Sequence, residues 1–132
     1  MSKASNYLED MTLNYFLRGQ TVNRPTSLYL ALYTTNPTDA DTGAEVVGGG
    51  YIRQSITFTA PTQQADRATV ANATKIEFPL PLSDWGEIAY FGIRDARDGG
   101  NLLLHGAFSK PMEIKEGNKI SIEAGNLTIS VG

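Results

Sequence analysis

Four apolar residues near the start of the chain recur at the spacing of one helix face: Leu8, Met11, Tyr15 and Phe16. This period predicts an amphipathic helix over about residues 4–18. Ser5 can cap its start, because a serine oxygen accepts a hydrogen bond from a free backbone N–H, and Gly19 suits the left-handed conformation that often follows a helix. Two interpretations of the apolar face stay open: it packs on the sheet of its own domain, or it docks on a neighbouring subunit.

The period changes to two in residues 27–33. The leucines at positions 28, 30 and 32 share one face of the predicted strand, and Tyr29, Ala31 and Tyr33 share the other. A strand that is apolar on both faces is usually buried on both. We expect either a central strand of a sandwich or a strand whose outer face is covered by another subunit.

Further alternating segments predict strands at these positions: residues 51–59, 74–78, 87–94, 101–108, 120–122 and 127–131. Residues 95–100 have the turn chemistry of a hairpin, and residues 109–111 are expected to end the strand before them. The last two segments are expected to pair with each other. The pattern indicates a mainly β chain, an antiparallel β-sandwich (jelly-roll-like) or barrel with one N-terminal α-helix. We expect residues 1–132 to form a single domain.

Residues 36–50 form a long predicted loop. Pro37 breaks any strand, and the glycines at positions 48–50 allow positive φ angles. Loops of this length in compact domains are often functional or ordered by a partner. Asp39 and Asp41 superficially resemble a calcium loop, but the closing glutamate of that motif is missing, so ion binding stays open. We expect this loop and the N-terminal helix to contact partner subunits.

Composition limits the possible chemistry. The 132-residue chain has no cysteine, one histidine and a net charge of −3. Disulfides and thiolate chemistry are therefore excluded, and one histidine is too few for the commonest zinc sites. The lysines and arginines form no cluster, so we expect no direct nucleic-acid ligand. The sequence has neither a signal peptide nor the ~20 apolar residues of a membrane span. We therefore expect synthesis in the cytoplasm, and we expect no membrane insertion.

No combination of residues resembles a catalytic site. His105 is the only candidate for a histidine base; it lies among leucines on a predicted strand, and no serine elbow accompanies it. The carboxylates at positions 84, 87, 95 and 98 fit turns and a strand start better than a glycosidase pair. Trp85 can stack on a sugar or a partner, but plugging the core at a strand entrance is the commoner role. We expect no enzyme activity, no cofactor and no metal site, and a structural role for His105.

Three parts of the chain resemble a family of short bacteriophage proteins described as tail fibre or virion structural proteins. They are LYLALYTTNPTDADTGAEVVGGGYIRQ at residues 28–54, WGEIAYFGIRDA with GGNLL at 85–103, and GNLTISVG at 125–132. The likeness covers roughly residues 26–132. It implies a structural role and carries no catalytic residue over to this chain.

The residues and the resemblance lead to one expectation, a bacteriophage virion structural subunit of the tail or neck that is made in the host bacterium. A capsid decoration (cement) protein and a carbohydrate- or receptor-binding module are the alternatives. We expect the partners to be copies of the chain, with three as the guessed number, other virion proteins and, in the last alternative, a host surface glycan. Eight side chains are the candidate partner contacts: Tyr7, Met11, Tyr15, Tyr29, Tyr33, Asp39, Asp41 and Trp85.

Overall fold

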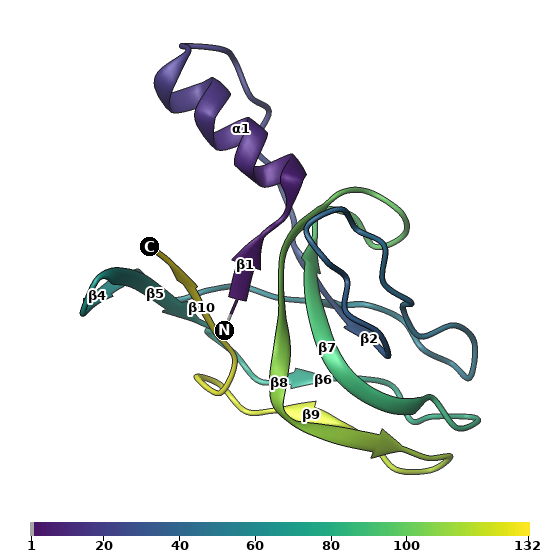
Figure 1. The fold of residues 1–132 in the computed structure, drawn as a ribbon. Helices are drawn as coiled ribbons and strands as arrows, with labels where there is room; N and C mark the ends of the chain where they lie inside the picture. The colour runs from purple at the N-terminus through teal and green to yellow at the C-terminus, as the bar shows by residue number, and fades with distance from the viewer. Residues whose placement is uncertain (1) are drawn as a thin grey trace.

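The computed structural model describes residues 2–132 and is mainly β, with one helix near the N-terminus (Figure 1). The strands form antiparallel sheets of five, three and two strands. Within the described residues none of these sheets closes on itself, so of the two predicted architectures the open sandwich is present and the barrel is not.

The five-stranded sheet has the order β1-β8-β7-β2-β3. Its strands have these bounds: β1 Ser2–Ala4, β8 Leu102–Ile114, β7 Gly86–Arg94, β2 Tyr29–Tyr33 and β3 Gln54–Ser55. Strand β2 lies between β7 and β3, and its residues Leu30, Ala31 and Leu32 are fully buried. The prediction of a central strand is therefore confirmed. The hairpin turn at residues 95–100 is confirmed as well, because it joins β7 to β8.

Two smaller sheets complete the β structure. One has the order β10-β5-β4, and the other pairs β6 with β9. These strands have the bounds β4 Thr62–Gln64, β5 Arg67–Ala71, β6 Ile76–Glu77, β9 Ser121–Ile122 and β10 Thr128–Val131. Because β9 pairs with β6 and β10 with β5, the prediction that the last two segments pair with each other is wrong.

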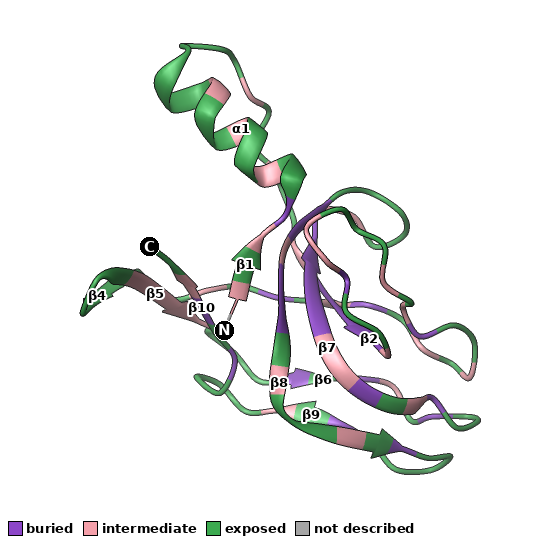
Figure 2. Cartoon of the chain, viewed as in Figure 1, coloured by how far each residue is buried: buried purple, intermediate pink, exposed green. Residues whose placement is uncertain are grey.

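The core lies between the large sheet and the smaller ones (Figure 2). Leu32 and Ile93 from the large sheet belong to the same buried cluster as Phe78, which follows β6, and Ile129 of β10. Trp85 joins this cluster just before β7, with its ring edge-on to those of Tyr51 and Phe78. Burial of these large side chains provides the main favourable term for folding.

Strand β8 is longer than predicted, because Pro111 does not end it. The pairing of β7 with β8 shifts between Ile88 and Tyr90, so that Ile88 faces Met112 while Tyr90 faces Ala107. Pro111 therefore lies in a bulged stretch. A proline is tolerated there because its missing N–H removes no bond from a regular ladder.

The helix α1, Asn6–Leu17, begins two residues later than predicted and has the expected cap, since Ser5 Oγ accepts a hydrogen bond from the N–H of Leu8 at 3.1 Å. Gly19 follows it with a φ of 67°. The helix projects away from the sheets (Figures 1 and 2), and none of its residues, all within the described part of the chain, is buried. Of the four residues of the predicted apolar face, Leu8 and Met11 are half-buried, whereas Tyr15 and Phe16 are exposed. The interpretation in which this face packs on its own sheet therefore fails for the outer half of the helix.

Candidate partner interface

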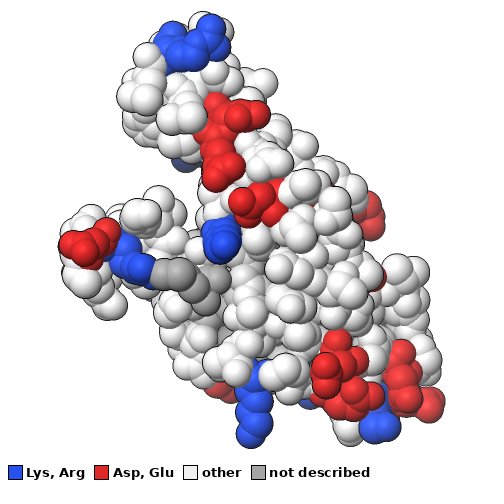
Figure 3. Space-filling model, viewed as in Figure 1, with Lys and Arg blue, Asp and Glu red and all other residues white. Residues whose placement is uncertain are grey.

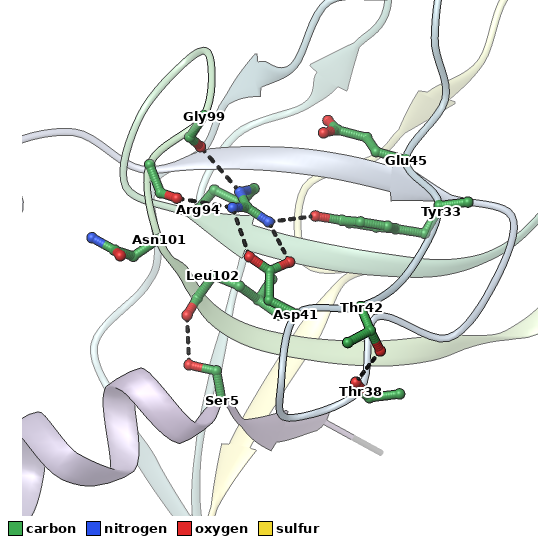
Figure 4. Close-up of polar contacts among 12 residues, drawn as sticks. Ser5, Tyr33, Thr38, Asp41, Thr42, Glu45, Arg94, Gly99, Asn101 and Leu102 are labelled. Carbon is green, nitrogen blue, oxygen red and sulfur yellow. Dashed lines mark hydrogen bonds and ion pairs between the residues drawn. The ribbon is translucent and has the colours of Figure 1, made fainter.

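Arg94 is the centre of a polar network beside the base of α1 (Figure 4). This arginine ends β7 and is 7% exposed. It donates two hydrogen bonds to the Asp41 carboxylate at 2.8 and 2.9 Å and one to Tyr33 Oη at 2.9 Å. The carbonyl oxygens of Gly99 and Gly100 accept the remaining bonds at 3.2 and 2.9 Å. All N–H donors of the guanidinium are thus used, and their fixed fork geometry sets the position of the loop that carries Asp41.

Arg53 forms a second clamp beside the first. It donates to both carboxylate oxygens of Glu45 at 2.8 Å and to the carbonyl oxygens of Ala96 and Gly99 at 2.9 and 2.8 Å. Tyr51 Oη donates to the same Glu45 carboxylate at 2.6 Å. The two arginines therefore converge on the 95–100 turn and tie the 36–50 loop to it.

The ionisation of these groups follows from burial and pairing. Burial alone would raise the pKa of Glu45, but hydrogen bonds from Arg53 and Tyr51 outweigh it and lower that pKa below its ordinary value. Burial alone would lower the pKa of Arg94, but bonds to Asp41 and Tyr33 more than compensate and raise it. Both shifts favour the charged forms of Glu45 and Arg94, which suits clamps.

Asp39 links the loop to the start of α1. Its carboxylate lies 2.7 Å from Nε2 of His105, which is 4% exposed on β8. Its backbone oxygen accepts a hydrogen bond from the N–H of Asn6, the first helical residue, at 2.8 Å. Ser5 also binds the sheet, because its N–H donates to the carbonyl of Leu103 and its hydroxyl to that of Leu102. The base of α1 is therefore firmly fixed although the helix itself is not covered.

The carboxylates of the 36–50 loop thus have protein partners: Asp39 with His105, Asp41 with Arg94, and Glu45 with Arg53. Ion binding by this loop would have to break those pairs. Across residues 2–132 no group of three or more His, Cys, Asp or Glu side chains is arranged to hold a metal ion. In the same part of the chain, no helix has the length and apolar character to cross a membrane.

The exposed apolar surface of α1 is the clearest unpartnered feature of this end of the molecule. Four of its residues are strongly exposed: Leu13 53%, Tyr15 53%, Phe16 74% and Leu17 76%. Tyr15 and Phe16 pack edge-on against each other at 5.0 Å between ring centres. Single exposed apolar residues are common, but a contiguous group on a projecting element is typical of an interaction site.

The eight candidate contacts divide between surface and interior. On α1, Tyr7 and Tyr15 are exposed and Met11 is half-buried. Asp39 and Asp41 lie together at the base of the helix, each paired with a side chain of its own domain.

The remaining candidates lie in or on the domain itself. Tyr33 is 1% exposed and bound to Arg94, and Trp85 is 6% exposed and donates its indole N–H to the carbonyl of Gly49 at 2.9 Å. Trp85 thus has the core role that the sequence favoured. The ring of Tyr29 lies beneath the guanidinium of Arg97, 5.2 Å from the ring centre.

Sequence reasoning missed the two buried arginines and the exposed Leu13 and Leu17. A signal for Arg94 existed, because it directly follows the strongly apolar strand residues Phe91 to Ile93 and precedes a turn. Its acidic partner lies more than fifty positions away, so the pairing itself could not be read from the sequence.

These features define the class: a mainly β protein with a projecting apolar helix, in which every buried side-chain N or O atom of residues 2–132 has a hydrogen-bond partner. The family model described as podophage GP4 fiber I protein gp80 matches residues 3–130, and the chain belongs to this family of bacteriophage fibre proteins. No curated protein sequence matches the chain. The family match confirms the resemblance to phage tail fibre proteins found in the sequence.

Proposed function

We propose that the chain is a structural subunit of the bacteriophage tail or neck that acts through protein–protein contacts and catalyses no reaction. The observation that carries this proposal is the uncovered apolar helix on a domain of a phage fibre family. The proposed partners are copies of the same chain, with a threefold arrangement, and other virion proteins. The proposed site of synthesis is the host cytoplasm.

The energetics of α1 support a docking role. A helix of 12 residues is marginal by itself in water, and most helices in proteins are stabilised by packing of an apolar face. Here the protein's own sheets provide packing only at the base of the helix. The hydrogen bonds of Ser5 and Asp39 hold that base in a set direction, so the helix is presented in one orientation before any partner arrives. Such preorganisation lowers the entropy that docking costs.

The polar network supports a structural role over an enzymatic one. Catalytic groups need free capacity to take a proton or attack a substrate. Arg94 and Arg53 instead use their donors on carboxylates and carbonyls of the protein itself. Their effect is to make the 36–50 loop part of the domain, with one fixed conformation against which a neighbour can pack.

A receptor-binding module is the second candidate. Burial of Trp85 removes the sugar-stacking residue that the sequence offered. A hollow of about 490 Å³ lies instead beside the base of α1, lined by polar and aromatic side chains that include Lys3, Asn6, Asp39 and Tyr90. Its volume suits a small ligand. Binding of host surface glycans to the isolated protein, lost in Tyr90→Ala while the fold survives, would favour this candidate.

Quantitative mass spectrometry of purified particles tests the proposed function. We expect the chain to be present at a fixed copy number per particle and to remain with the tail fraction when capsids and tails are separated. Co-purification with empty capsids would favour the decoration alternative. Its absence from particles that retain full infectivity would refute a structural role in the virion.

A further inference from the structure

A second exposed apolar surface lies at the other end of the molecule. Val47 is 92% exposed, Leu80 52% and Leu82 70%; we name these three side chains the aliphatic platform. Leu82 lies against Gly50, because a Cβ atom on Gly50 would be only 3.2 Å from the Leu82 side chain. The 46–50 and 80–82 loops therefore lie next to each other. The platform is adjacent to the start of β7, whereas α1 begins beside the end of that strand.

The loops of the platform are held rigidly. The carbonyl oxygen of Gly49 accepts hydrogen bonds from the N–H of Leu82 at 2.9 Å and from the indole of Trp85 at 2.9 Å. Gly49 has a φ of 59°, a conformation that side chains rarely adopt. The N–H of Gly117 donates to the carbonyl of Pro81 at 3.0 Å and fixes the second loop. The aliphatic side chains are therefore exposed on a backbone that these hydrogen bonds hold in place.

Carboxylates surround this end of the molecule. Glu87 on β7 lies directly opposite Glu113 on β8, a like-charge pair that destabilises an antiparallel ladder. Asp84 and Glu116 lie next to each other, because the N–H of Glu116 donates to the Asp84 carboxylate at 2.8 Å. Lys110, Lys115 and Lys119 are the cations nearest to these carboxylates in the sequence, and Lys119 pairs with Glu77. Figure 3 shows acidic groups where β7 begins and β8 ends, with a basic group beside them.

The far end of α1 has the complementary character. Leu13, Phe16 and Leu17 provide its exposed apolar surface, and Arg18 and Arg24 follow. Arg18 donates a hydrogen bond to the side-chain oxygen of Asn14 at 2.9 Å. Among the described residues it forms no salt bridge with a carboxylate. In Figure 3 basic side chains cover the outer end of the helix, at the opposite pole from the acidic end.

We propose that the outer end of α1 of one copy docks on the aliphatic platform of a second copy, so that copies associate head to tail. This inference rests on the proposed structural role and names the partner of α1. Apolar surface meets apolar surface, and Arg18 meets the carboxylates of Glu87 and Glu113. A chain cannot make this contact with itself, because β7, nine residues long, separates the base of its helix from its platform by roughly 27 Å.

The symmetry of the assembly follows from this contact. Two different surfaces meet, so the interface is heterologous and generates either a closed ring or an open filament. In a ring of three copies, each helix docks on the platform of the next copy, so no helix and no platform is left exposed. A pairing of helix with helix would instead leave each platform exposed.

Cysteine cross-linking tests the contact cleanly, because the natural chain has no cysteine. Two separately purified proteins, Leu17→Cys and Leu82→Cys, are mixed at high micromolar concentration and oxidised. We expect a mixed disulfide dimer at least tenfold more abundant than the dimers that either protein forms alone. A mixture of Leu17→Cys with Thr62→Cys, whose new thiol lies on the exposed strand β4, is the matched control and should give only background.

Charge reversal provides a second readout that does not depend on thiol reactivity. Arg18→Glu in the helix donor should lower the yield of mixed dimer several-fold, and Glu87→Lys with Glu113→Lys in the platform donor should restore it.

Three outcomes would overturn the proposal. The first is a yield of mixed disulfide dimer no higher than that of the Thr62→Cys control. The second is a Leu17→Cys protein that alone forms as much dimer as the mixture does. The third is a yield that neither charge reversal changes. None of them would affect detection of the chain in purified particles, so the proposed structural role is judged separately.

Discussion

Replacement of Arg94 by methionine removes the centre of the polar network while keeping most of the aliphatic bulk. The wild-type side chain makes five hydrogen bonds, to Tyr33, to both oxygens of Asp41 and to the carbonyls of Gly99 and Gly100. Methionine can make none of them. The cost in stability depends on which of the former hydrogen-bond partners can be solvated by water.

The magnitude follows from the exposure of those partners. The Asp41 side chain is 38% exposed, so its carboxylate regains water and the loss is smaller than the ~3–5 kcal/mol of a fully buried broken pair. The carbonyl of Gly99 keeps its bond to Arg53. Tyr33 is 1% exposed, and a buried hydroxyl without a partner costs about 1–3 kcal/mol. We expect Arg94→Met to lower the free energy of unfolding by about 3 kcal/mol.

Urea unfolding measured by far-ultraviolet circular dichroism is the assay. With a slope of about 2 kcal/mol/M, a loss of about 3 kcal/mol moves the midpoint down by about 1.5 M. Arg97→Met is the matched control, because this exposed arginine makes a cation–π contact with Tyr29 at 5.2 Å worth less than about 1 kcal/mol. In an Asp41→Asn background the cost of Arg94→Met should shrink, since the two side chains act together.

Two results would contradict this expectation: a loss of less than about 1 kcal/mol for Arg94→Met, or a loss equal to that of Arg97→Met. Either result would mean that water replaces the network at little cost. The two arginine clamps would then not be what holds the 36–50 loop in place.

Trp85→Ala should cost about 3–5 kcal/mol in urea unfolding because the ring fills the core, and a loss under 1 kcal/mol would contradict that position. The pKa of Glu45 is lowered in the folded protein, so its contribution to stability is complete above the unfolded pKa of about 4.5 and is lost as the pH falls through the lower folded pKa. Glu45→Gln should therefore weaken the loss of stability that the wild type shows on acidification. An unchanged dependence of stability on acidic pH would contradict this. Phe16→Ser with Leu17→Ser should change the free energy of unfolding by less than about 0.5 kcal/mol yet abolish self-association in sedimentation velocity; a large loss of stability would mean that the helix is packed in the free protein. His105→Gln should leave particle assembly and infectivity near wild type, and a folded, assembled variant that lost infectivity by orders of magnitude would reopen a receptor-binding or enzymatic role.

The sequence was most informative where the decisive interactions are local. The start of α1 could be predicted because Ser5 caps it through a contact only three residues long. The central strand β2 could be predicted because both of its faces are apolar, and the turn after Arg94 because its residues suit a tight hairpin. In each case the cause lies within a few neighbouring residues.

Prediction failed where distant segments choose among competing partners. Apolar and polar residues alternate in the segments that end at Ile122 and Val131, as expected of strands. The first segment pairs with β6 and the second with β5, and these partners depend on long-range packing that the local sequence pattern does not contain. Strand β4 was missed because Thr62–Gln64 contains no apolar residue. The apolar period of α1 predicted the helix, but it could not say that the protein's own sheets leave the outer half of that helix exposed.

Incorporation of an α1 variant into particles tests most directly the central claim that this chain works by being held through its helix. A phage carrying Leu13→Ser, Phe16→Ser and Leu17→Ser is propagated in cells that supply the wild-type protein, and the particles from a final cycle without that supply are purified. The number of copies of the chain per particle is then counted by quantitative mass spectrometry. The account predicts that the soluble variant folds normally by circular dichroism yet is depleted from particles at least tenfold. A variant incorporated at the wild-type copy number would contradict it.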